Sequence, residues 1–250
     1  MNKIFSGERT HNNSLLCLRL GTVLLLLACF VQQGRSQMFD ETEPPLDDFR
    51  SLGVSGALQS FEPRSGNSLA DSAKIRFKTP LWMAEYRQSG LRIAIGFSSY
   101  KFDNDSRSEF TLAAETVTDL PLLTGSSGAN FFLPVVFSTN FVQATGATNS
   151  TKDFNLADIG VGAGLKFKQA SRDFEIQLTG FGVLYYSTEG FSIESGSSTA
   201  VVGEVQVLLR EIIGEGMIAG YRIESENWSI SGGAMNYSRL FHGPFIGIFF

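Results

Sequence analysis

Apolar and polar residues alternate one by one along most of this chain, and this period of two constrains its fold more than any other feature. The clearest stretch is residues 159–168, IGVGAGLKFK, in which odd positions are apolar and even positions are glycine or lysine. Strict alternation is the pattern of a β-strand with one apolar and one polar face, because successive side chains point to opposite faces. No comparable helical periodicity follows residue 50. The sequence therefore predicts an all-β fold.

The alternation predicts about ten strands, most of them long enough to cross a bilayer at a tilt, which takes about 9–11 residues. The links after the second, sixth and eighth strands are short, whereas those after the first, fifth, seventh and ninth are long and polar. Two links do not fit this alternation of short and long connections. DNDSR at 103–107 is short where a long loop is expected, and DLPLLTGSSGAN at 119–130 is long where a short turn is expected. The predicted strands are residues 50–61, 74–87, 90–102, 107–118, 130–142, 156–168, 172–186, 200–212, 216–226 and 239–250.

Short turns at one end and long loops at the other are typical of outer-membrane barrels. The last residues add a second signal, because Pro244, Ile246, Ile248 and Phe250 alternate along the final strand. This ending resembles the C-terminal signature of bacterial outer-membrane β-barrel proteins. The departures are Phe245 and Phe249, which put bulky rings on the face that should line the lumen.

The resemblance implies an antiparallel up-and-down transmembrane β-barrel over residues 50–250, surrounded by outer-membrane lipid. Eight strands instead of ten would result if the first strand, or the poorly alternating region around Phe131, lay outside the barrel. The resemblance also implies that the barrel-assembly machinery reads Ile246, Ile248 and Phe250 as an assembly signal.

The first 36 residues have the composition of a secretory signal peptide, with basic residues followed by the apolar run at 20–31. That run is too short to span a bilayer as a helix, which needs about 20 residues. We expect cleavage after Ser36, which leaves an acidic periplasmic tail at 37–49. The alternative is a lipoprotein processing site, with Cys29 acylated.

Removal of this peptide takes away both cysteines and leaves His242 as the only histidine. A disulfide-stapled scaffold, a zinc cluster and a cysteine nucleophile are thereby excluded. The whole chain has a formal net charge of -5 and no Lys/Arg-rich block, which argues against a nucleic-acid partner. We therefore predict no cofactor and no metal, and the sequence does not specify a ligand.

Charged residues fall mainly on the polar faces, which would line the lumen of a barrel. A barrel of about eight strands is nearly filled by its own side chains, so most of these charges should pair with one another. Basic residues outnumber acidic ones in this set, which predicts a weak preference for anions in any water path. The predicted lumen charges are Lys74, Arg76, Lys78, Arg92, Glu109, Glu115, Lys166, Lys168, Glu175, Glu204, Arg210, Arg222 and Glu224.

A small structural or narrow, porin-like transport barrel is the function that these features favour. A soluble, secreted β-barrel or β-sandwich binding protein is the main alternative, because alternation does not show which face is dry. Aromatic residues near predicted strand ends would form interfacial girdles in a membrane barrel and core contacts in a soluble one. They are Phe61, Tyr100, Phe102, Phe141, Tyr185 and Trp228.

Two further alternatives place function near the loops. A barrel hydrolase would use His242 as its base, with a Ser or Asp partner from a loop. No catalytic motif supports this, and the prediction is that the chain is not an enzyme. An adhesion barrel would bind through the polar segments at 143–154 and 187–199.

Overall fold

β-strands make up nearly all of the part of the chain that the computed structural model describes, which is residues 49–63, 75–76, 80–102, 105–125, 129–146, 154–171, 174–189, 195–210, 215–230 and 237–250. Two of these strands, the two-residue β2 and the longer β3, both pair with β1, so together they count as one strand of the barrel. The strands are β1 (Arg50–Pro63), β2 (Ile75–Arg76), β3 (Leu81–Gln88), β4 (Leu91–Phe102), β5 (Asp105–Thr124), β6 (Ala129–Gly146), β7 (Phe154–Ala170), β8 (Phe174–Glu189), β9 (Ser195–Arg210), β10 (Gly216–Ile230) and β11 (Tyr237–Phe249).

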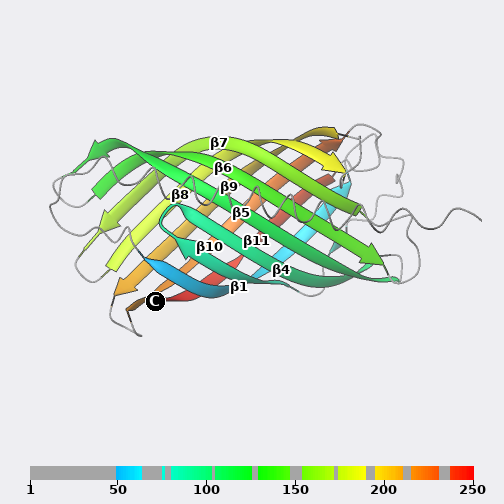
Figure 1. The fold of residues 1–250 in the computed structure, drawn as a ribbon, viewed down its shortest axis with the longest axis horizontal. Helices are drawn as coiled ribbons and strands as arrows, with labels where there is room; N and C mark the ends of the chain where they lie inside the picture. Colours follow the sequence, from blue (N-terminus) through cyan, green and yellow to red (C-terminus); the bar gives the residue numbers. More distant parts are fainter. Residues whose placement is uncertain are drawn as a thin grey trace, which may run out of the picture. The chain divides into compact units, whose positions relative to one another are not determined.

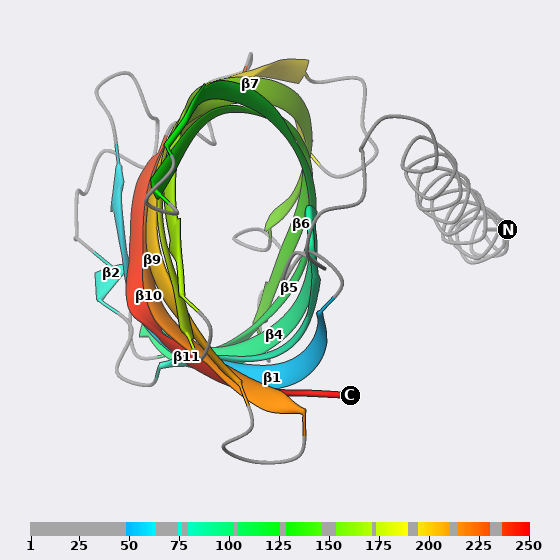
Figure 2. The same ribbon diagram turned by 90° about the vertical axis from the view of Figure 1, so that its left-hand side faces the viewer.

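These strands form one closed, ten-stranded antiparallel barrel (Figure 1). Each strand pairs with its neighbours in chain order, and β11 pairs with β1 from Ser51↔Phe249 to Pro63↔Tyr237. Figure 2 shows β1 and β11 side by side where the ring closes. The predicted all-β, up-and-down barrel is confirmed, and the eight-stranded alternative is wrong.

The two ends of the barrel differ in their connections. At the turn end, strands are connected by residues 89–90, 125–128, 171–173 and 211–215; at the loop end, by residues 64–74, 103–104, 147–153, 190–194 and 231–236. Gly90, in the turn between β3 and β4, has a φ of 69°, a conformation that glycine adopts without steric cost.

Two predicted connections are wrong because strand pairing continues through them. β5 runs on to Thr124, which leaves only 125–128 as a turn, and the register shifts between Pro121 and Leu123. Proline cannot donate a ladder hydrogen bond, so its presence made this segment look like a link. The predicted loop at 187–199 is mostly strand as well. There, the Ser187 hydroxyl donates to Ser198 Oγ at 3.0 Å across the pair β8–β9.

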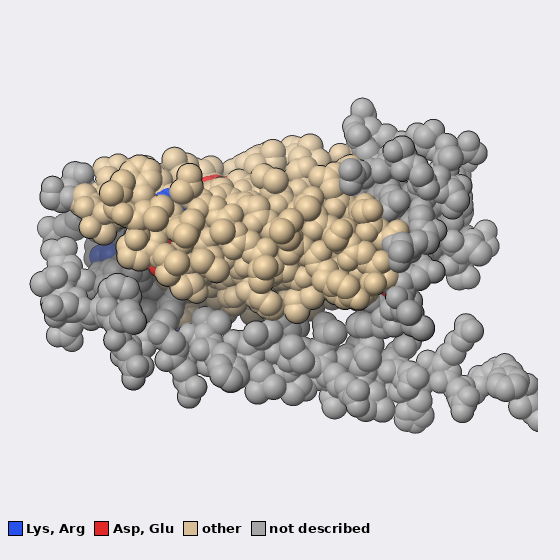
Figure 3. Space-filling model, turned by 90° about the horizontal axis from the view of Figure 1, so that it is seen from above, with Lys and Arg blue, Asp and Glu red and all other residues tan. Residues whose placement is uncertain are grey.

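The apolar face of the strands points outward. Leu165, Leu184 and Val201 are 65%, 69% and 66% exposed, although each is a large apolar side chain. On the face shown in Figure 3, the described surface is almost entirely without Lys, Arg, Asp and Glu. The outward direction of this apolar belt is the property that alternation in the sequence did not reveal.

Glycines on the inner face of β7 make room for large side chains from β8. A Cβ on Gly162 would lie 2.2 Å from the Gly182 carbonyl oxygen and 2.9 Å from the side chain of Val183, and one on Gly164 would lie 2.5 Å from the Phe181 Cα. Phe181 and Val183 are buried in the interior. The glycine alternation in residues 159–168 therefore reflects close packing between neighbouring strands.

Among the described residues, no helix is long and apolar enough to cross a membrane. The predicted signal peptide with its cleavage site after Ser36, Cys29 and residues 37–48 of the acidic tail lie outside the described residues.

Candidate functional site

A chain of ion pairs occupies the lumen and includes two arginines beside the turn between β3 and β4. Arg87 on β3 and Arg92 on β4 are directly opposite each other in the register, which alone would be repulsive. Both bind Glu85: the Nε of Arg87 lies 2.8 Å, and the Nη2 of Arg92 3.1 Å, from its carboxylate oxygens. The side chain of Glu85 is 3% exposed. Its buried carboxylate is therefore what makes the facing pair of arginines tolerable.

Several ion pairs link strands that are not neighbours in the sheet, and two short ones cross the lumen. Arg87 Nη1 on β3 lies 2.8 Å from Glu204 on β9, and Arg222 Nη2 on β10 lies 2.8 Å from Glu115 on β5. Arg222 also contacts Glu204 at 3.2 Å and Glu224 at 3.1 Å. One arginine thus holds three carboxylates from three strands, and the interior is tied together across its width.

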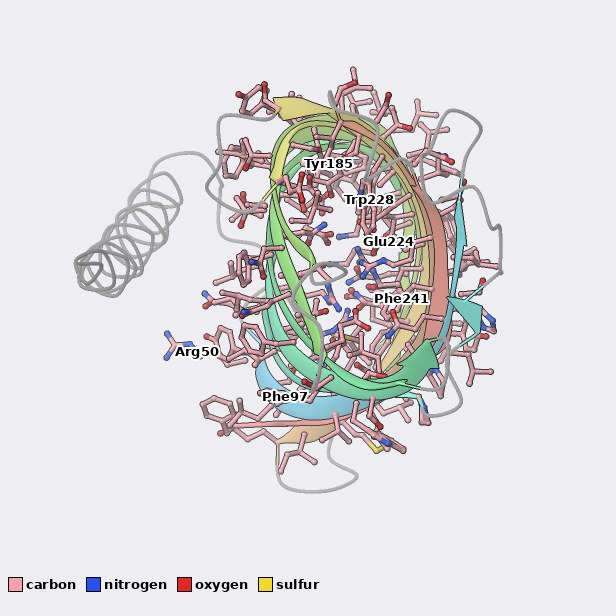
Figure 4. The ribbon with its side chains drawn as sticks, turned by 90° about the vertical axis from the view of Figure 1, so that its right-hand side faces the viewer. Arg50, Phe97, Tyr185, Glu224, Trp228 and Phe241 are labelled. Carbon is pink, nitrogen blue, oxygen red and sulfur yellow. The ribbon has the colours of Figure 1, made fainter. Side chains whose placement is uncertain are left out.

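A second cluster lies nearer the loop end, around Arg239 on β11. Its Nε is 2.9 Å from Glu226 and its Nη1 is 3.8 Å from Glu109. Gln59 Nε2 donates to Glu109 at 2.8 Å, and Asn140 Nδ2 donates to Glu226 at 3.2 Å. Figure 4 shows Tyr185, Glu224, Trp228 and Phe241 reaching into the same interior, whereas Arg50 and Phe97 point away from it.

A third group lies at the turn end. Lys168 is 3.2 Å from Glu175, and Lys166 is 2.6 Å from Asp119. Gln177 donates to Glu175 and in turn accepts from Gln206 Nε2 at 2.6 Å. Gln206 also accepts from Arg87, so these contacts extend the same polar network.

The structure places most of the predicted lumen charges on the inner face. Buried there are Arg92, Glu109, Glu115, Glu175, Arg222 and Glu224, with Lys166, Lys168 and Glu204 slightly more accessible. Arg210, at the end of β9, is partly exposed. Lys74, Lys78 and the side chain of Arg76 lie outside the described residues.

Sequence reasoning missed five buried lumen charges: Glu85, Arg87, Asp158, Glu226 and Arg239. Glu85 and Arg87 follow Leu81 and Met83 on the same face of β3, so an apolar run concealed the alternation. Asp158, Glu226 and Arg239 lie near the ends of predicted strands. Continuing the alternation of inner and outer residues to those ends would have assigned them to the lumen as well.

With these residues included, the described part of the lumen has the opposite balance of charge to the predicted positive excess. Three of the basic residues behind that prediction, Lys74, Arg76 and Lys78, have side chains outside the described residues. Among the described residues carboxylates outnumber cations in the lumen, and near the loop end Glu109, Asp158 and Glu226 are buried with Arg239. The predicted set left out acidic side chains near the loop end, Asp158 and Glu226, and therefore gave too positive a charge for the described part of the lumen.

Two small cavities lie on either side of the Arg222–Glu115 contact. One, of about 80 Å³, is at the turn end, where Phe49, Gln88 and Gly90 form part of its lining. The other, of about 20 Å³, is lined toward the loop end by Asn140, Glu224 and Arg239. Each is large enough for at least one water molecule. Both are lined by Arg92, Glu115 and Arg222, which form the wall between them.

The outer face carries one polar pair of interest. Tyr221 Oη and His242 Nδ1 are 2.6 Å apart on the neighbouring strands β10 and β11. Tyr185 and Trp228, two of the candidate girdle residues, are instead buried in the interior, at 5% and 1% exposure. The side chains of Phe61, Tyr100 and Phe102 lie outside the described residues.

The predicted assembly-signal residues all lie on the outer face. Ile246, Ile248 and Phe250 are about half exposed, at 49%, 51% and 56%. Within the described ranges, no group of three or more His, Cys, Asp or Glu side chains has the arrangement of a metal site.

No protein-family model matches this chain, and no curated protein matches it. Solved structures that it resembles are outer-membrane β-barrels. The translocator domain of the autotransporter NalP from Neisseria meningitidis is 10% identical, with 95% of this chain and 98% of that chain covered and a TM-score of 0.37. The transport unit of the autotransporter AIDA-I from Escherichia coli is 9% identical (90% and 97% covered, TM-score 0.38). Neisserial surface protein A is 17% identical (80% and 97% covered, TM-score 0.31).

Proposed function

We propose that this chain is an integral β-barrel of a bacterial outer membrane, with a lumen that is closed at rest by its own side chains. The observation that supports this most directly is the inversion of polarity across the barrel wall. Leu184 on the outside is 69% exposed, whereas Arg222 and Glu224 on the inside are 5% and 6% exposed. Lipid solvates such a surface favourably, and water does not.

A soluble, secreted barrel would have the opposite arrangement. Soluble monomers rarely expose a continuous apolar patch beyond a few hundred Å². Here the exposed large apolar side chains come from every long strand, from Leu52 on β1 to Ile248 on β11. The soluble alternative therefore requires a second protein to cover nearly the whole wall.

A closed lumen argues for a structural or narrow transport role rather than for an open porin. Barrels with open aqueous channels have sixteen or more strands. In this ten-stranded barrel the Arg87–Glu204 and Arg222–Glu115 contacts cross the interior. Removing one partner of such a buried pair costs about 3–5 kcal/mol, so the network also makes the barrel rigid.

Export would depend on the signal peptide at 1–36, and insertion on the barrel-assembly machinery. The outward alternation of Ile246, Ile248 and Phe250 agrees with the second role, because an assembly factor could reach these side chains before the ring closes. Membrane lipid is then the partner of the whole outer face.

The experiment that tests this proposal is fractionation of the expressed full-length chain, followed by gel electrophoresis of boiled and unboiled membrane samples. We expect the protein in the outer membrane, and faster migration without boiling because a closed barrel stays folded in detergent. Recovery from the periplasm or medium with identical migration of both samples would rule out the membrane barrel.

The geometry around His242 does not support the hydrolase alternative. Its Nδ1 faces the hydroxyl of Tyr221 on the outer wall, and its ring also packs against the ring of that tyrosine, so its contacts among the described residues are those of a structural pair. We propose that the chain is not an enzyme. Purified wild-type barrel should hydrolyse phospholipids and peptides no faster than His242→Ala, and a loss of activity in that variant would contradict this.

A further inference from the structure

We propose that the Arg222–Glu115 contact is a gate in the lumen, and that the path it opens conducts small monovalent cations. This inference rests on the proposed membrane barrel and adds an activity to it. It is carried by three observations: the position of the contact between two cavities, the alternative partners of Arg222, and the uneven distribution of charge along the lumen.

The contact is the shared wall of the two cavities. The larger cavity extends from the turn end as far as Arg92, Glu115 and Arg222, and the smaller one begins at the same three residues. The Nη2 of Arg222 reaches across to the Glu115 carboxylate at 2.8 Å. Separation of this contact would join the two volumes at their shared wall.

Arg222 can leave Glu115 without losing all of its charge partners. Glu204 lies directly opposite on β9 in the register and is 3.2 Å away, and Glu224 follows two residues later on the same face of β10 at 3.1 Å. These two carboxylates lie on the wall that also carries Arg222, whereas Glu115 lies on β5. A rotation of the arginine toward its own wall therefore keeps the guanidinium paired and removes its contact with Glu115.

The charge of the lumen beyond the gate selects for cations. Glu226, Asp158 and Glu109 are buried toward the loop end, where Arg239 forms ion pairs with Glu226 and Glu109. Carboxylate oxygens, such as those of Glu226 and Asp158, are the type of ligand that hard cations prefer. A small anion entering this half would meet net negative charge at close range.

The test is single-channel recording in planar bilayers with the full chain, using Glu115→Gln, which keeps the shape of the side chain and removes its charge. Loss of one charge-assisted hydrogen bond should raise the open probability about tenfold over wild type. The matched control is Glu215→Gln, which removes a carboxylate from an exposed turn at the same end of the barrel and should leave conductance unchanged.

Selectivity is measured from the reversal potential of Glu115→Gln in a KCl gradient. We expect a cation-selective sign, and a smaller reversal potential when Asp158→Asn is added. If Glu115→Gln does not fold, Glu115→Asp makes the same test, because it keeps the charge but shortens the reach to Arg222.

Folded Glu115→Gln that is as silent as wild type, or an opened path that selects anions, would overturn the gate. The mobility shift on unboiled gels is recorded for the same preparations. A barrel that shows the shift but no added conductance refutes only the gate, whereas a barrel without the shift in wild type refutes the membrane barrel itself.

Discussion

The guanidinium carbon of Arg87 lies 3.7 Å from the centre of the Phe245 ring, inside the barrel. A cation over an aromatic face is attracted to the ring, and more strongly where water is excluded. Phe245 also packs with Leu208, Ile218 and Phe249 in an apolar cluster of the interior. The aromatic residues that depart from the C-terminal signature are thus part of the support beneath the ion-pair network.

Phe245→Ala should destabilise the barrel by about 3–5 kcal/mol, because it empties a buried aromatic site and removes the support of Arg87. The measurement is the temperature at which the fast-migrating, folded form disappears from unboiled gels. Phe245→Leu is the control and should lower that temperature less. Equal stability of Phe245→Ala and wild type would show that the ring contributes little.

Gly162→Val should prevent tight closure between β7 and β8. A Cβ at this position already lies 2.2 Å from the Gly182 carbonyl oxygen, and overpacking of this kind costs about 1–3 kcal/mol or more. The control is Gly180→Ala, because a Cβ there would meet its nearest atom at 3.9 Å. Refolding into detergent, followed by gel mobility, should separate the two. A fully folded Gly162→Val would contradict the close packing described for β7.

Leu184→Arg tests which solvent surrounds the outer face. If lipid does, a charge there costs about 2–4 kcal/mol at the bilayer midplane, and the yield of membrane-inserted barrel falls. Leu184→Phe keeps the face apolar and should insert normally. In a soluble barrel the arginine would be tolerated on a side chain that is 69% exposed, so normal yield of the arginine variant would count against the membrane.

Phe250→Ala separates assembly from stability. The ring is 56% exposed on the outer face, so its loss should scarcely change the unfolding temperature of purified, refolded barrel. In cells, we expect less protein in the outer membrane and more degraded or periplasmic chain, as measured by fractionation. Phe249→Ala, inside the lumen, should show the reverse pattern. Unchanged insertion of Phe250→Ala would remove the support for recognition by the assembly machinery.

The sequence by itself determined the strand content, the antiparallel order and which residues share a face of the sheet. Two-residue periodicity is a local property, and in β7 it holds from Ile159 to Lys168. Local patterning failed at Pro121, where a strand continues through a bulge, and at Ser187 and Ser198, where both faces are polar and the strand pairing shows only in three dimensions.

The tertiary structure decided which face meets lipid and which charges meet one another. Arg222 and Glu115 are far apart in the chain and on strands that do not pair, so their contact exists only because the sheet closes into a ring. The same closure brings Arg87 over Phe245 and gathers carboxylates toward the loop end. Alternation reports the side of the sheet on which a residue lies. Curvature and register, which set the distances across the lumen, depend on all ten strand positions together.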